Sequence, residues 1–454
     1  MLMASVDGTI VSVGLPKMQE DLDTTLALIG WTLTAYMLTQ VIALPAAGKL
    51  SDELGRKRLF IASVVIFTVG SLGAGLAPNV YVHIIFRVIQ ALGSAAFMPA
   101  AIGILGETFA ERRQTAIGLF ASTFPIGGIV GPNLGGAIID HLSWRWMFFV
   151  NLPIGVMLIY FGLKVLPSSA RKMTGKPLDK AGMGLFAAGM LLALIGLTNW
   201  ANNPQDVTAL NVWLLVGVGL LALAAFLWHE GRAKAPMVEM QLLRSKPFLA
   251  ANLYSFLFGA CVFGYFTFIP YYAITGYGLT ASQIGLAMTP RSVAAITLSI
   301  FSAFLLVKLG YRRPMMVGPV IIASSLFLLG LGLRDVVIFG YHMPNGVLLS
   351  LEVLLAGVGV GILNPVAQNA SIDIHPEKIG AISGLRGMFS NTGGILGTTG
   401  IILALSHFDD KTAGFERIFL VLSLLILCSI PLVLLIPERV RKPPPAKMGQ
   451  PPAV

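Results

Sequence analysis

Apolar runs of roughly 18 to 25 residues recur along the whole chain, and each is long enough to cross a bilayer as a helix. Of the 454 residues, 56% are apolar and only 11% are charged, which no soluble domain of this length could carry. We therefore predict an all-α membrane protein. The fourteen predicted spans cover residues 1–16, 28–49, 59–77, 81–105, 115–139, 147–166, 181–200, 211–229, 247–275, 283–307, 314–333, 347–370, 380–406 and 417–436.

Basic residues fall mostly on one side of these spans. The chain contains 31 Lys and Arg residues, and most of them lie in alternate loops and in the C-terminal tail. By the positive-inside rule this side is cytoplasmic, so we expect a multi-pass protein of the inner (plasma) membrane with both termini in the cytoplasm. The net charge of +10 then reflects topology and gives no indication of nucleic-acid binding.

Several kinds of chemistry are not indicated by the sequence. Cys261 and Cys428 both lie in predicted spans and the six His residues are far apart, so we expect neither a disulfide framework nor a metal site. Without a G-x-x-x-x-G-K-S/T loop or a catalytic constellation, we expect no cofactor, no ATP hydrolysis and no enzymatic activity. Work must then draw on an ion gradient. The expected partners are a small lipophilic substrate, protons and the lipid bilayer, and we expect a monomer.

An internal repeat relates the two ends of the chain. Residues 99–131 match residues 365–397 at a constant offset of 266, so that Pro99 corresponds to Pro365 and Glu111 to Glu377. Transporter folds are commonly built from such repeats, which pack around a central, water-accessible cavity. The predicted organisation is an N-terminal six-helix bundle at 1–166, a linker with two extra spans at 167–246, a C-terminal six-helix bundle at 247–436 and a disordered cytoplasmic tail at 437–454.

The first cytoplasmic loop reads "GKLSDELGRKR". Its glycines allow a tight turn and close helix approach, while the acidic and basic residues can form ion pairs that hold one conformation closed. The alternative is a simple positive-inside stop signal. The predicted cytoplasmic gate consists of Gly48, Asp52, Gly55, Arg56 and Lys57.

The fourth predicted span carries Arg87 and, one turn later, Gln90. An Arg within so apolar a helix is costly unless it faces a cavity or a partner, so we expect Arg87 to have a functional partner.

The fifth predicted span reads "GGIVGPNLGG". Small residues at four-residue spacing let two helices approach closely, and a Pro softens the helix. Simple packing would explain the pattern equally well. The predicted hinge or seal consists of Gly127, Gly131, Pro132, Gly135 and Gly136.

Together with "VDGTIVSVGLP" and "WRWMFFVNLPIG", these three stretches resemble the fourteen-span drug:proton antiporter family of the major facilitator superfamily over nearly the whole chain. Glu53 replaces a usual basic residue in the loop motif and Ala91 replaces a Gly in the fourth-span motif, while the fifth-span motif is matched in full. The resemblance implies the major facilitator fold, proton-coupled export, and roles for Asp7 and Arg87.

Four charged residues reach a similar depth in their spans. At about 1.5 Å per helical residue, Asp7, Arg87, Arg291 and Glu352 each lie roughly 9 to 13 Å below the outer end of the helix. Transporters of this kind bind substrate and coupling ions near the membrane midplane. We therefore predict a proton-coupling and substrate site made of Asp7, Arg87, Gln90, Arg291 and Glu352. The alternative for Asp7 and Arg87 is a static ion pair that locks two spans together.

The ninth predicted span is rich in aromatic rings. Rings on a membrane helix commonly face lipid, but one face could line the cavity and contact flat lipophilic cations. The candidate pocket-lining residues are Phe256, Phe263, Tyr265, Phe266, Asn364, Gln368 and Asn391.

Proton-coupled export of lipophilic, cationic drugs or toxic compounds is the function that these patterns favour. Export of a specific metabolite, antibiotic or lipid is the alternative within transport, and a non-transporting sensor or scaffold is a remote one. The first span covers only about 24 Å, so we also expect the native start to lie upstream of Met1.

Overall fold

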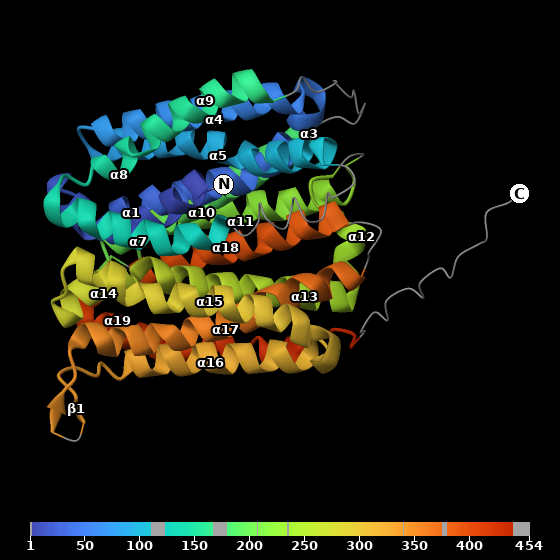
Figure 1. The fold of residues 1–454 in the computed structure, drawn as a ribbon. Coiled ribbons are helices and arrows are strands. Elements are labelled where there is room, and N and C mark those ends of the chain that lie inside the picture. The colour runs from blue at the N-terminus through green and yellow to red at the C-terminus, as the bar shows by residue number, and fades with distance from the viewer. Residues whose placement is uncertain are drawn as a thin grey trace, which may run out of the picture.

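The structure is a computed structural model that describes residues 2–109, 123–166, 179–206, 208–233, 236–338, 340–374 and 379–438. Long helices run side by side across the molecule (Figure 1). The helices are α1 (Leu2–Asp21), α2 (Leu26–Ile29), α3 (Trp31–Leu54), α4 (Arg56–Leu76), α5 (Val80–Thr108), α7 (Thr123–His141), α8 (Trp146–Phe149), α9 (Asn151–Val165), α10 (Lys180–Asn202), α11 (Leu210–Glu230), α12 (Met240–Leu243), α13 (Lys246–Phe258), η2 (Gly259–Phe263), α14 (Gly264–Tyr277), α15 (Ala281–Leu309), α16 (Arg312–Gly330), α17 (Asn345–Ile374), α18 (Ile379–Ser406), α19 (Lys411–Leu427) and α20 (Ile430–Val433).

A short antiparallel hairpin marks one end of the helix bundle. Strands β1 (Val337–Ile338) and β2 (Tyr341–His342) pair so that Val337 faces His342. We call this the hairpin end, and the opposite end, near α12, the tail end (Figure 1). The tail predicted at 437–454 and the part of the predicted linker at 167–178 lie outside the described residues, except for residues 437 and 438.

The structure supports twelve candidate membrane spans among the described residues, and the predicted count of fourteen is not supported. The predicted spans at 1–16 and 115–139 account for the difference. These two regions contribute α1 and α7, and α7 is described only from Thr123 onward. Helix α1 contains Pro16 and the charged residues Asp7 and Lys17, which lower its apolarity, whereas α7 is described over only part of the predicted span.

The helices form two groups that meet along a seam (Figure 1). We call α1 to α9 the first half and α13 to α20 the second half. Helices α10 and α11 pair with each other, and α10 packs against α3 of the first half and α18 of the second. Each half has its own buried apolar cluster, one around Ile10 and Phe148 and the other around Phe268 and Phe415.

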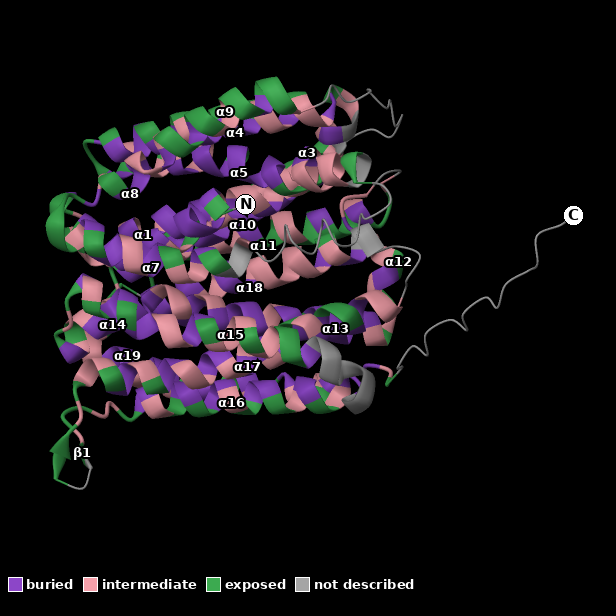
Figure 2. Cartoon of the chain, in the orientation of Figure 1, coloured by how far each residue is buried: buried purple, intermediate pink, exposed green. Residues whose placement is uncertain are grey.

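Exposed residues occur along many of the helices (Figure 2), and a large share of them are large apolar residues. On α9 and α11, for example, Val156, Phe161, Leu221 and Trp228 are more than half exposed. Exposed apolar area of this extent is unfavourable in water and suits contact with lipid tails. The burial pattern therefore agrees with a membrane-embedded bundle.

Glycines at corresponding repeat positions make corresponding contacts. A Cβ at Gly131 of α7 would lie 3.1 Å from the backbone oxygen of Val6 on α1. Its repeat counterpart, Gly397 of α18, would place a Cβ 2.7 Å from the carbonyl carbon of Ala260 in η2. Each half therefore joins a glycine-bearing helix to its own first long helix, backbone to backbone.

A second glycine contact seals the two halves together at the hairpin end. A Cβ at Gly285 of α15 would lie 2.7 Å from the Pro132 oxygen of α7, and one at Gly136 would lie 2.7 Å from the carbonyl carbon of Ala281. The backbone N–H of Ser282 also donates to Asp140 Oδ2 at 2.8 Å. We call this α7–α15 contact the hairpin-end seal.

Gly285→Val should open this seal, because the added side chain cannot fit against the α7 backbone. Spin labels at Leu142 and Leu331, in a background without Cys261 and Cys428, should move apart by several ångströms. Gly217→Val is the matched control, since a Cβ at Gly217 meets nothing within 4 Å. Equal distances in the two variants would contradict the assignment.

Candidate functional site

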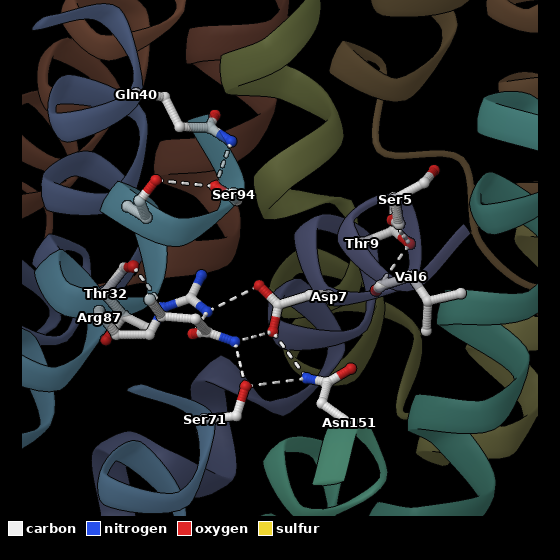
Figure 3. Close-up of polar contacts among 12 residues, drawn as sticks. Ser5, Val6, Asp7, Thr9, Thr32, Gln40, Ser71, Arg87, Ser94 and Asn151 are labelled. Carbon is white, nitrogen blue, oxygen red and sulfur yellow. Dashed lines mark hydrogen bonds and ion pairs between the residues drawn. The ribbon is translucent and has the colours of Figure 1, made fainter. Parts of the chain in front are cut away.

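Asp7 and Arg87 form a buried ion pair inside the first half (Figure 3). Arg87 of α5 donates from Nη1 to Asp7 Oδ2 at 2.8 Å, and both side chains are fully buried. Asp7 lies on α1, so the pair joins the first and the fourth predicted spans. A buried charge is stable only when it is paired and hydrogen-bonded, and the surrounding residues meet that requirement.

The second oxygen of Asp7 is held by amide groups. Gln90 Nε2 donates to Asp7 Oδ1 at 2.7 Å and to Ser71 Oγ at 2.7 Å. Asn151 Nδ2 lies 3.3 Å from the same Asp7 oxygen. Figure 3 shows Arg87 of α5 and Asn151 of α9 pointing toward Asp7, with Ser71 of α4 beside Asn151. Both carboxylate oxygens of Asp7 therefore have hydrogen-bond donors.

The guanidinium of Arg87 has three kinds of neighbour. Its Nε donates to the Thr32 carbonyl at 3.1 Å, and its Nη1 also reaches Gln90 Oε1 at 2.5 Å. The guanidinium carbon, Cζ, lies 4.2 Å from the centre of the Tyr36 ring and 5.6 Å from the centre of the Phe148 ring. Cation–π attraction is strongest where water is excluded, so the rings add to the stability of the buried charge.

The charges of the second half are arranged differently. Arg291 of α15 lies over the Phe266 ring, with its guanidinium carbon 4.0 Å from the ring centre. Glu352 of α17 accepts a hydrogen bond from the Tyr277 hydroxyl at 2.9 Å. Among the described residues no ion pair joins Arg291 to Glu352, or either of them to Asp7 or Arg87. Of the four charged residues predicted to share one site, Asp7 and Arg87 form an ion pair, and Arg291 and Glu352 are two separate buried groups.

A cavity of about 160 Å³ lies on the seam between the halves. The second half contributes α14, α15 and α17, and the first half contributes α1 and α7. The lining residues are Ser5, Thr9, Gly128, Phe266, Arg291, Ser292, Ala295, Gly357 and Val360. Arg291 is the charged member of this set, and Asp7, although on α1, is not a member.

The other predicted pocket residues lie elsewhere. Tyr265 is fully buried in the second half, where its hydroxyl lies 3.3 Å from Ser325 Oγ, so it does not line this cavity. Asn364 accepts a hydrogen bond from Arg386 at 3.2 Å. Phe256, Phe263, Gln368 and Asn391 also lie outside the cavity lining, and only Phe266 of the predicted set belongs to it.

The predicted gate residues make contacts within the first half. Lys57 donates to the carbonyls of Leu163 at 2.9 Å and Leu166 at 2.7 Å, at the end of α9. Arg56 donates to the Gly103 carbonyl on α5. Gly55 links α3 to α4 with a φ of 89°, which only glycine adopts readily. A Cβ at Gly48 would meet nothing within 4 Å. The Asp52 side chain lies outside what the structure describes.

Sequence reasoning missed three partners of the ion pair: Ser71, Asn151 and the Thr32 carbonyl. Asn151 lies in the quoted stretch "WRWMFFVNLPIG". A lone amide side chain in such an apolar run indicates a polar partner inside the bundle and could have been used to predict this contact. Ser71 and Thr32 gave no such signal, because hydroxyl residues are common in membrane helices and a backbone carbonyl has no sequence signature. No group of three His, Cys, Asp or Glu residues that could hold a metal occurs in the described part of the chain.

Arg87→Gln should lower the free energy of unfolding by about 3–5 kcal/mol, because it leaves the Asp7 charge buried without a counter-ion. Adding Asp7→Asn should recover much of that loss, since the double variant buries no charge. Denaturant unfolding of the purified protein measures both, with the exposed-site variant Arg417→Gln as control. Additive losses would show that the two residues do not act as a pair.

Comparisons with known proteins agree with this architecture. The chain matches the Major Facilitator Superfamily over residues 1–398 and, in a second match, over 276–453. It is 30% identical over 405 residues to the multidrug transporter protein MdtP of Bacillus subtilis (strain 168), covering 88% of this chain and 72% of the relative. It is 29% identical to the tetracenomycin C resistance and export protein of Streptomyces glaucescens, covering 91% and 76% of the two chains.

Solved structures show the same fold at low sequence identity. The nucleoside transporter NupG aligns with a TM-score of 0.68 at 15% identity, over 95% of this chain and 96% of that one. A D-xylose-proton symporter aligns with a TM-score of 0.66 at 15% identity, over 96% and 95% of the two chains. The family match spans more than half of the chain, and the fold, the spans and the seam cavity agree with it. The chain is therefore a member of the Major Facilitator Superfamily, a family of multi-pass membrane transporters rather than enzymes.

Proposed function

We propose that the chain is a proton-coupled antiporter that exports lipophilic drugs or related toxic compounds, and that it belongs to the fourteen-span drug:proton antiporter type. The observation that carries the proposal is the Asp7 carboxylate, buried beside Arg87 on a helix that also lines the seam. Relatives described as multidrug and antibiotic-resistance transporters, at about 30% identity, support export of drugs.

The orientation follows the distribution of basic loops. With both termini in the cytoplasm of a cell with an inner (plasma) membrane, the hairpin end faces outward. The hairpin-end seal then closes the outer side. Any opening of the described state therefore faces the cytoplasm. Alternating access requires this α7–α15 contact to break while a contact nearer the tail end forms.

Asp7 is the group that we assign to the proton. A proton on Asp7 Oδ2 removes the ion pair with Arg87, and Gln90 and Asn151 then contact a neutral acid in place of a carboxylate. Because these residues come from three helices of the first half, α1, α5 and α9, a change of charge at Asp7 acts on the packing of that half. The proposed cycle uses no cofactor, and the proton gradient provides the energy.

Asp7→Asn should abolish coupling, since an amide fills the same space but cannot take up a proton at neutral pH. In liposomes, ethidium, chloramphenicol and benzoate represent cationic, neutral and anionic substrates. At least one should release protons with the wild type and none with Asp7→Asn. Asp409→Asn, the same change at an exposed site, is the control.

The outcomes separate two parts of the proposal. Proton release that survives in Asp7→Asn would remove Asp7 from the coupling role and leave antiport intact. If no compound releases protons with the wild type, proton antiport of drugs is wrong.

Export of one specific compound is the second candidate. The 29% identity to a tetracenomycin C resistance and export protein favours it, because that relative is described for a single compound. A narrow response in the liposome panel would favour this candidate over multidrug export. The transporter family of the chain argues against a non-transporting sensor or scaffold.

A further inference from the structure

The charge that faces the seam cavity is positive. Arg291 is 8% exposed, and it is the charged side chain among the described residues that line the cavity. The two carboxylates of the predicted site do not reach it. Asp7 is fully buried against Arg87, and Glu352 is bonded to Tyr277 outside the lining set.

Arg291 has no counter-ion in the part of the chain that the structure describes. Its Nε has no hydrogen-bond partner, and its Nη2 makes one long contact of 3.5 Å with the adjacent Ser292 hydroxyl. A charge nine-tenths buried in an apolar bundle is costly unless something neutralises it. Arg87, the buried arginine of the first half, is by contrast paired with the Asp7 carboxylate and also donates to the Thr32 carbonyl and to Gln90 Oε1. The missing element at Arg291 is therefore an anion or a strong acceptor.

Two hydroxyl groups of the cavity lining have their protons bound by backbone carbonyls, and neither hydroxyl carries a charge that could neutralise Arg291. Ser292 donates its hydroxyl proton to the Gly128 carbonyl at 2.9 Å, and Thr9 donates to the Gly127 carbonyl at 2.9 Å. The first bond crosses the seam from α15 to α7, and the second joins α1 to α7 within the first half. The guanidinium is thus the group with N–H donors left for a ligand.

Size and apolar surface complete the recognition chemistry. Phe266, Ala295 and Val360 supply apolar walls, and the guanidinium carbon of Arg291 lies 4.0 Å from the centre of the Phe266 ring. A cavity of about 150 Å³ is sufficient for a single benzene ring, and this one measures about 160 Å³. The cavity therefore fits one aromatic ring that carries a charged group, and a larger molecule would extend beyond it.

We propose that the seam cavity binds aromatic compounds through an anionic or strongly accepting group, a carboxylate or phenolate, placed against Arg291. This inference rests on the proposed export function and narrows its substrate class. It departs from the cationic class predicted from the sequence, because the carboxylate that prediction relied on, Asp7, is engaged by Arg87 away from the cavity.

Binding without a gradient tests this separately from transport. Benzoate and phenyltrimethylammonium carry opposite charges on the same ring, and ligand-observed NMR titrations measure their affinity for the full-length protein in lipid nanodiscs at neutral pH. Benzoate should bind more tightly than phenyltrimethylammonium. Arg291→Gln should weaken benzoate binding by about tenfold or more, as expected for loss of a charge-assisted contact. Arg291→Lys should retain part of the affinity, because it keeps the charge but loses the planar fork.

Arg386→Gln is the matched control, since it removes another Arg of the second half that is bonded to Asn364 outside the cavity lining. Benzoate affinity should be unchanged in that variant. Tighter binding of phenyltrimethylammonium, absence of benzoate binding, or equal losses in the Arg291 and Arg386 variants would overturn the inference. If benzoate binds through Arg291 but no compound releases protons in liposomes, the binding site stands and the antiport function fails.

Discussion

The buried pair of Asp7 and Arg87 is the interaction around which the first half is organised. An ion pair in an apolar bundle requires every donor and acceptor to be matched, because no bulk water is available to replace a lost partner. Here the matching groups come from α1, α3, α4, α5 and α9. The hydrogen bonds of the pair and its partners involve five helices. A change of charge at the Asp7 carboxylate therefore alters contacts between all five helices.

The second half shows the opposite electrostatic arrangement. Its buried charges are separated, and one of them borders the space between the halves. In the proposed cycle, Asp7, the group assigned to the proton, is therefore kept apart from Arg291, the group proposed to contact the ligand. Coupling then depends on the packing between α1, α7 and α15 rather than on direct competition for one carboxylate.

Sequence reasoning predicted much of the helical layout, because apolar runs bounded by charged loops have few alternative structures in a bilayer. It also placed Asp7 and Arg87 at one depth, and the structure places them in contact. Their functional roles remain predictions. The count of fourteen spans is not supported at α1, which carries a proline and charged residues, or at α7, which is described only from Thr123 onward. Side-chain direction was the other limit: nothing in a run of aromatic residues shows that Phe266 faces the cavity and Tyr265 the core.

Helix α7 has glycines on two of its faces, and the two faces have different neighbours. Gly127, Gly131 and Gly135 lie against α1 within the first half, whereas Gly136 lies against α15 across the seam. The two sets therefore constrain different properties of the protein. A larger residue on the α1 face disturbs assembly of the half and reduces the amount of folded protein in the membrane. In the proposed cycle, a larger residue on the α15 face acts on the contact between the halves and changes how long the transporter stays in each of its two orientations, so substitutions along this one helix distinguish effects on assembly from effects on turnover.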